Sequence, residues 1–159
     1  MHLYIEKIPG ILLVGHCMQT SHQEEQTTTL WQGFMPRRKE ISELSSSDLY
    51  SVEEYDEDFF LNYAPDRKFN KWAACPVKRI VALPQGMVSI TIPAGLYARV
   101  HYQGKGSEAA SVYQSFFQTW LPASGYMLDN RPHFARMGEK YKNEDLTSEE
   151  DLFFPIRKT

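Results

Sequence analysis

A run of acidic residues leads directly into an aromatic segment near the end of the chain. Residues 148–151 are Ser-Glu-Glu-Asp, and residues 152–156 are Leu-Phe-Phe-Pro-Ile. The second segment has the composition of a β-strand, and side chains alternate between the two faces of a strand. We therefore expect Asp151 and Phe153 to share one face, with Leu152 and Phe154 on the other.

A carboxylate beside aromatic rings suits a lipophilic cation. The ligand's charge would neutralise the acid, and the rings would cover its hydrophobic body and add cation–π attraction. An acid buried in such a site is expected to have a raised pKa when the site is empty. The alternative is that residues 149–151 form only a solvated entry to the strand, which is the usual role of a short charge run.

The composition fits one globular domain covering residues 1–159, in which 13% of the residues are aromatic. A net charge of −3 gives no basic footprint for nucleic acid. Cys17 and Cys75 lie in apolar surroundings without metal-ligand spacing, so we expect free thiols in a reducing compartment. No export signal or membrane-spanning run is present. These features predict a cytoplasmic location, with no membrane partner, metal or cofactor.

The order of predicted elements occurs twice. The first half has a strand over residues 4–20, a helix from a Ser21–Glu24 capping box to Phe34, and strands over 48–52 and 70–79. The second half has a strand over 92–102, a helix with Ser107 as a plausible N-cap that stops at Pro122, and strands over 134–137 and 151–157. Each half therefore reads strand–helix–strand–strand.

Three short segments match between the halves in the same order. Residues 8–10, 31–36 and 72–79 correspond to residues 92–94, 117–122 and 151–158. We predict an α+β fold in which repeats of approximately 1–80 and 86–159 pair about a pseudo-two-fold axis. Helices on one face of an antiparallel sheet would leave the other face free, with a ligand cleft at the junction of the repeats. Asp151 then takes the place that Trp72 has in the first repeat.

Several of these segments resemble one family. They are residues 97–104 (Tyr-Ala-Arg-Val-His-Tyr-Gln-Gly), 120–126 (Trp-Leu-Pro-Ala-Ser-Gly-Tyr), 132–137 (Pro-His-Phe-Ala-Arg-Met) and 151–156. Together they resemble the GyrI-like, or AraC-type, effector-binding domain, and the resemblance covers the whole chain. The family includes ligand domains of multidrug-responsive transcription activators and free-standing proteins such as the DNA gyrase inhibitory protein.

The resemblance implies the duplicated fold and a cleft in which aromatic rings and one carboxylate bind lipophilic cations. The family's acid lies four residues before the strand proline, which is the position of Asp151. Glu is more common there, and Glu150 is the alternative if the register differs by one residue. Met137 stands where the family often has Tyr, and its flexible thioether suits a promiscuous pocket.

We therefore expect a free-standing protein that binds amphipathic, cationic aromatic compounds such as drugs or effectors. No helix-turn-helix pattern precedes Ile8, so we expect no DNA-binding domain and no direct contact with nucleic acid. No catalytic residue is assigned. The predicted ligand-binding residues are Asp151, Glu150, Phe153, Tyr97, Trp72, Tyr55, Phe59 and Met137.

Two alternative functions follow from the same resemblance. The first is hydrolysis of strained-ring alkylating compounds, with Asp151 or Glu150 as general base or nucleophile and Tyr97 as proton donor. The second is a protein-interaction module of the gyrase-inhibitor type. In that case the acidic stretch 53–58 would meet a basic partner surface; otherwise it is a solvated loop.

Overall fold

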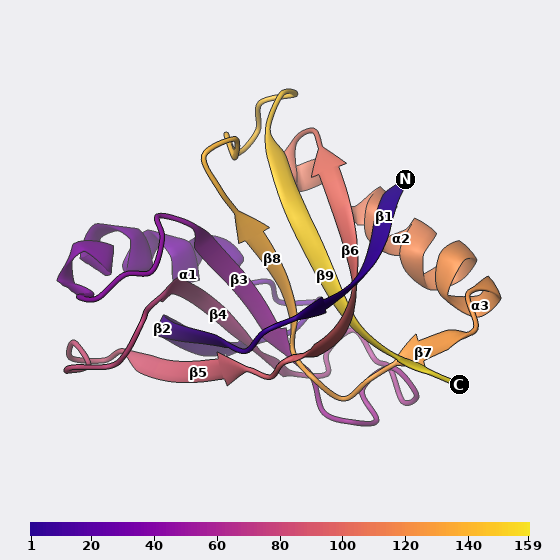
Figure 1. Cartoon of the computed structure of the whole chain (residues 1–159), viewed down its shortest axis with the longest axis horizontal. Helices are drawn as coiled ribbons and strands as arrows, with labels where there is room; N and C mark the ends of the chain where they lie inside the picture. Colours follow the sequence, from indigo (N-terminus) through magenta and orange to yellow (C-terminus); the bar gives the residue numbers. More distant parts are fainter.

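The computed structural model describes residues 1–159. Eight strands form one antiparallel sheet in the order β1-β6-β9-β8-β3-β4-β2-β5, and a short strand, β7, pairs with β9 (Figure 1). The strands are β1 His2–Ile8, β2 Ile11–Thr20, β3 Leu49–Glu54, β4 Phe69–Pro76, β5 Val88–Ile92, β6 Gly95–Gln103, β7 Tyr126–Leu128, β8 His133–Met137 and β9 Glu149–Lys158.

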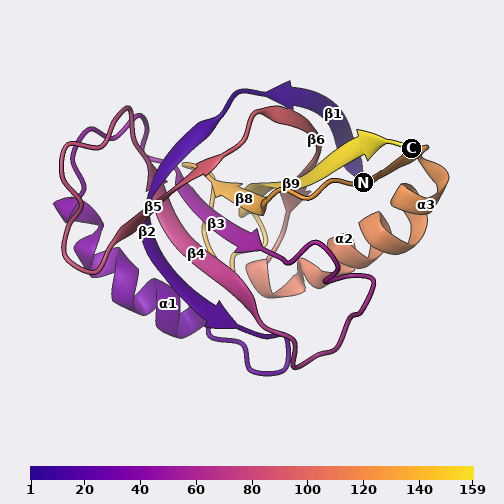
Figure 2. The same ribbon diagram turned by 90° about the horizontal axis from the view of Figure 1, so that it is seen from below.

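The helices lie on one face of the sheet, as Figure 2 shows. Helix α1 (Thr27–Phe34) runs into a 3-10 helix, η1 (Met35–Glu40). A 3-10 turn, η2 (Gly106–Glu108), precedes helix α2 (Ala110–Ser115), which continues through a π-helical turn, η3 (Phe116–Trp120), into α3 (Leu121–Ala123). None of the helices has the length and hydrophobicity needed to cross a membrane.

The strand order has an internal symmetry. From one edge the sheet runs β1-β6-β9-β8, and from the other edge the corresponding strands run β5-β2-β4-β3. The edge strands are exchanged between the halves: β1 pairs with β6, and β5 pairs with β2. The predicted antiparallel sheet with helices on one face is confirmed. The repeat boundaries and the pseudo-two-fold axis stay predictions.

Two long strands expected from the sequence are each divided in the structure. The segment 4–20 breaks at Pro9-Gly10, which separates β1 from β2. The segment 92–102 breaks at Pro93-Ala94, which separates β5 from β6. Proline cannot donate a hydrogen bond to a strand ladder, which explains why each break falls there. The sequence prediction also missed β7 and most of β5.

The expected helix starts were also wrong in detail. Ser21 Oγ accepts a hydrogen bond from the Glu24 amide at 3.0 Å, but α1 begins only at Thr27. Thr20 Oγ1 closes the intervening loop by accepting from the Gln26 amide at 3.0 Å. Ser107 caps no helix, because its amide and hydroxyl both donate to Glu144.

The sheet separates the core into a helix face and a free face. On the helix face, Leu30 and Phe34 of α1 pack with residues of β2 and β4, and Phe116 packs with residues of β6 and β9. The free face carries a cluster with no helical member, made of Leu13, Tyr50, Val52, Trp72, Ala74, Ile92, Tyr97, Phe134 and Phe153. Phe153 is in this cluster and Phe154 is on the helix face, so the predicted alternation along β9 is confirmed.

Candidate functional site

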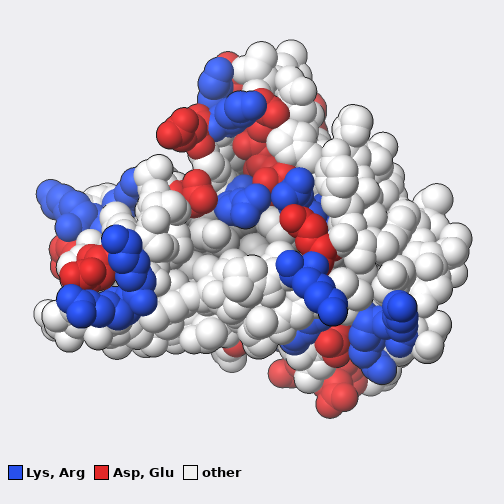
Figure 3. Space-filling view, viewed as in Figure 1, with Lys and Arg blue, Asp and Glu red and all other residues white.

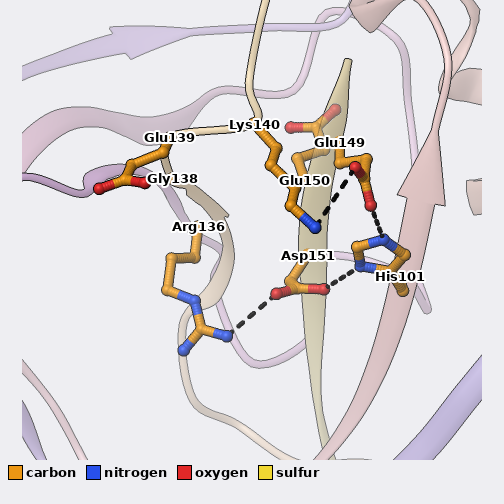
Figure 4. Close-up of a pocket in the computed structure, with 8 residues that line it drawn as sticks. All are labelled: His101, Arg136, Gly138, Glu139, Lys140, Glu149, Glu150 and Asp151. Carbon is orange, nitrogen blue, oxygen red and sulfur yellow. Dashed lines mark hydrogen bonds and ion pairs between the residues drawn. The ribbon is translucent and has the colours of Figure 1, made fainter. Parts of the chain in front are cut away.

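Asp151 lies on the free face between two basic side chains from the neighbouring strands. The register pairs it with His101 on β6 and Arg136 on β8. His101 Nδ1 is 2.8 Å from Asp151 Oδ1, and an Arg136 guanidinium nitrogen is 3.0 Å from Oδ2 (Figure 4). Both oxygens of the carboxylate are therefore occupied by groups of the same chain.

Arg136 also occupies the position that the sequence predicted for a ligand cation. Its guanidinium carbon lies 5.2 Å from the centre of the Phe153 ring. Phe153 stacks on Phe134 with ring centres 4.4 Å apart. The predicted arrangement of acid, ring and cation is thus present on the free face, but the cation is internal. Sequence reasoning placed the strand that holds Arg136 and missed the register that brings it to Asp151.

The electrostatics of Asp151 differ from the expectation. Burial alone would raise the pKa of Asp151, but hydrogen bonds from His101 and Arg136 outweigh burial and lower it. The pKa of His101 is raised by its bonds to Asp151 and Glu149, whose Oε1 lies 2.8 Å from Nε2. The predicted raised pKa is therefore wrong for Asp151.

The cavity beside Asp151 is polar. It has a volume of about 290 Å³ and no hydrophobic side chain in its lining. Figure 3 shows acidic and basic side chains gathered over this part of the molecule. The lining residues are His101, Arg136, Gly138, Glu139, Lys140, Glu149, Glu150 and Asp151. Such a lining does not offer the aromatic walls expected for a lipophilic ligand.

Trp72 and Tyr97 lie in the same free-face cluster as Phe153, and their polar groups already have partners. Trp72 is 6% exposed, and its indole N–H donates to Glu54 at 2.6 Å. Tyr97 is fully buried and donates its hydroxyl hydrogen to the Pro132 carbonyl at 3.3 Å. Both rings are packed in the hydrophobic core in this structure, on the opposite face of the sheet from Glu150.

The other four predicted residues lie on the helix face. Strand alternation places the side chains of Glu150 and Met137 there, although Glu150 also borders the polar cavity beside Asp151. Tyr55 and Phe59 follow β3 in the connection to β4. Tyr55 packs against Phe59 at 4.6 Å and against His133 at 5.0 Å between ring centres. The sheet therefore divides the eight predicted residues: Asp151, Phe153, Tyr97 and Trp72 lie on the free face, and Glu150, Tyr55, Phe59 and Met137 on the helix face.

Glu150 differs from Asp151 in having no hydrogen bond or ion pair from its carboxylate to the rest of the protein. Burial raises its pKa to about 7, and the negative charge of Glu53 contributes to the rise. Lys71 opposes this effect, but its ammonium group is bound to Glu53 at 2.6 Å. The raised pKa expected for an empty cation site is thus found on Glu150.

Three tyrosines near the start of β9 are influenced by the charge of Glu150. Tyr102 is paired with Glu150 across the β6–β9 ladder. Burial raises the pKa values of Tyr102, Tyr113 and Tyr141, and the nearby charge of Glu150 raises them further. The charge of Glu150 therefore affects the pKa values of tyrosines from β6, from α2 and from the loop before β9. None of these three tyrosines was among the predicted site residues.

His133 is a further residue that the sequence did not single out. It is buried among the rings of Tyr55, Phe60 and Phe117. Burial lowers its pKa to about 3, so the imidazole is neutral at physiological pH. A single histidine in an apolar strand carries no spacing signal, which is why the pattern did not reveal it.

Comparison with known proteins identifies the family. The family model described as "Cass2: Integron-associated effector binding protein" matches residues 4–156. The chain belongs to this family. The transcriptional regulator BrlR of Pseudomonas aeruginosa is 25% identical over 158 residues, covering 98% of this chain and 56% of BrlR. The chain thus spans about half the length of this relative.

Two solved structures share the fold. The EcmrR chain in an EcmrR–DNA complex superposes with a TM-score of 0.74 at 14% identity, covering 99% of this chain and 58% of EcmrR. SAV2435 bound to tetraphenylphosphonium gives a TM-score of 0.73 at 12% identity, covering 99% of this chain and 94% of SAV2435. These likenesses show the fold, and the predicted resemblance to effector-binding domains is confirmed.

Proposed function

We propose that this protein is a small-molecule effector-binding protein that takes up a lipophilic organic cation, with Glu150 as the counter-charge. One observation carries the proposal: Glu150 is a partly buried carboxylate with no cationic partner, paired with Tyr102 across the ladder and close enough to Tyr113 for its charge to raise the pKa of that phenol. A carboxylate removed from water is costly unless a positive charge accompanies it. A cation with a hydrophobic body supplies that charge and gains cation–π attraction from the rings.

Family membership supports the proposal at the level of small-molecule binding. The structure of SAV2435 contains tetraphenylphosphonium, a cation whose charge is enclosed by four aromatic rings. A ligand of this type needs one acid and several aromatic contacts rather than a set of directional hydrogen bonds. The helix face of this chain offers Glu150 together with Tyr55, Phe59 and Tyr113.

The proposal assigns the counter-charge to Glu150 in preference to Asp151. Arg136 and His101 already satisfy Asp151, so a ligand cation there would have to displace a bound guanidinium group. Glu150 requires no such exchange between side chains. Phe153, Trp72 and Tyr97 then act as core residues on the free face, and Tyr102, Tyr113 and Tyr141 join Tyr55 and Phe59 as the proposed aromatic contacts.

A titration with three related compounds tests the proposal. Tetraphenylphosphonium, neutral triphenylphosphine oxide and anionic tetraphenylborate are added to the wild type, Glu150→Gln and Asp151→Asn, and intrinsic tryptophan fluorescence is followed. We expect the wild type and Asp151→Asn to bind the cation at least about tenfold more tightly than the neutral compound. Glu150→Gln should lose this preference.

The two variants also show which face of the sheet holds the binding site. If Asp151→Asn loses the preference and Glu150→Gln keeps it, the free face is the binding site and the assignment to Glu150 is wrong. If all three compounds bind equally well to every protein, the site does not select for positive charge. Absence of binding would refute the proposed ligand class.

A further inference from the structure

One partly buried carboxylate near the start of β9, that of Glu150, has no cationic partner. Three neighbouring carboxylates do have one: Glu53 with Lys71 at 2.6 Å, Asp151 with Arg136 at 3.0 Å, and Glu149 with Lys140 at 3.8 Å. No basic side chain lies within ion-pairing distance of Glu150. When the site is empty, a proton is the simplest way to neutralise this group.

We infer that a proton and the ligand cation compete for Glu150, so that ligand uptake releases one proton to solvent. This inference rests on the proposed function and adds a regulatory property to the same site. The exchange is balanced: the O–H bond of the neutral carboxylic acid breaks, the proton passes to water or buffer, and the carboxylate becomes the partner of the bound cation. Total charge is the same before and after.

The groups that face Glu150 do not offer another source for that proton. On the helix face these groups are Tyr102 from β6, Tyr113 from α2, Tyr141 from the loop before β9, Glu53 from β3 and Lys71 from β4. Asp151 is the next residue of β9, and its side chain lies on the opposite face. The tyrosines keep their protons because burial raises their pKa values. Burial would lower the pKa of Lys71, but Glu53 raises it overall. Asp151 is already ionised, since its bonds to His101 and Arg136 lower its pKa.

His101, on the free face, is another group whose proton could be released when the ligand binds. It lies between Asp151 and Glu149, and hydrogen bonds with both carboxylates raise its pKa, so it is a second proton-binding group near the start of β9. Its side chain is on the opposite face of the sheet from Glu150, one strand away. The test must therefore separate the two residues by substitution.

The exchange predicts how affinity depends on pH. A permanent cation such as tetraphenylphosphonium cannot itself titrate, so any change in its affinity reports the protein. Below the pKa of Glu150, which is about 7, affinity should rise about tenfold for each unit of pH. Above that pKa the carboxyl is already ionised, and affinity should level off.

Calorimetric titration with tetraphenylphosphonium measures the released proton directly. The titration is repeated at roughly pH 6 in buffers of different ionisation enthalpy, because the slope of observed enthalpy against buffer enthalpy gives the number of protons released. We expect close to one proton for the wild type and for His101→Gln. Glu150→Gln should release none, and its weaker binding should be independent of pH.

The outcomes separate this inference from the proposed function. Binding without proton release, or with release that survives in Glu150→Gln, overturns the exchange and leaves the cation-binding function standing. Release that disappears in His101→Gln alone overturns it as well, because His101 would then be the source. No binding of tetraphenylphosphonium at any pH would refute the proposed function and, with it, the exchange.

Discussion

The two faces of the sheet hold the same combination of acid and aromatic rings but use it differently. On the free face, Asp151 is bound by Arg136, which also lies over the ring of Phe153. On the helix face, Glu150 has rings nearby and no cation. The acid on the free face is therefore neutralised within the protein, whereas Glu150 is the acid for which we propose a ligand cation.

The largest difference between the faces should appear when a ring is removed. Phe153→Ala deletes a side chain that is 3% exposed and stacked on Phe134, so we expect unfolding free energy to fall by about 3–5 kcal/mol. Phe60→Ala is the control on the helix side, where the ring is 39% exposed and the loss should be below about 1.5 kcal/mol. Denaturant unfolding measures both. A small loss for Phe153→Ala would show that the free-face cluster is not the structural one.

Removing the charge of the free-face acid should have the next largest effect. Asp151→Asn leaves Arg136 and His101 without their shared carboxylate, and we expect a loss of about 1–3 kcal/mol at neutral pH. Cation binding should be unaffected. If the variant is as stable as the wild type, the network around Asp151 contributes nothing and the contrast between the faces is lost.

The matched change on the helix face should act in the opposite direction. The folded-state pKa of Glu150 is raised to about 7, so the folded protein holds a proton that the unfolded chain has already released. Stability from this group therefore falls as pH rises from the ordinary Glu range to about 7. Glu150→Gln should remove that slope and stabilise the protein by about 1–2 kcal/mol at pH 8, after allowance for partial exposure. Thermal unfolding at several pH values measures the effect, and a destabilised variant would contradict it.

The smallest effect concerns His101. Because its folded-state pKa is raised, its contribution to stability is complete below the ordinary His range and is lost as pH rises through the raised value. With a side chain 38% exposed, this contribution should stay below about 1 kcal/mol. The difference in stability between the wild type and His101→Gln should shrink from pH 6 to pH 9. A difference that does not change with pH would mean that His101 is not charged in the folded protein.

Local patterns predicted what depends on neighbouring residues in the chain. Alternation along 151–154 placed Asp151 and Phe153 on one face and Leu152 and Phe154 on the other, as found. The pairing of Asp151 with Arg136 depends on the register between β8 and β9, which is set across the connection 138–148. A one-residue change in that register would move every side chain of the strand to the opposite face. Sequence alone therefore proposed both Asp151 and Glu150 but could not separate their environments.

Local sequence signals were also limited in predicting how the strands pair. Turn and helix signals predicted the strand–helix–strand–strand order, because they act over a few residues. They did not predict that residues 2–8 pair with β6 instead of continuing β2, since that depends on contacts about a hundred residues away. Pro9-Gly10 was a readable signal for the break, but it does not say which strand the first segment joins.

The exchange of edge strands ties the formation of each half to the other. β1 completes a ladder on β6 that joins His2 to His101, and β5 completes one on β2. An isolated first half would leave β1 without its ladder and β2 without β5. Native pairing must therefore wait until distant parts of the chain have met, and loop closure of this length slows folding. The molecule should fold and unfold as one cooperative unit, although its strand order repeats.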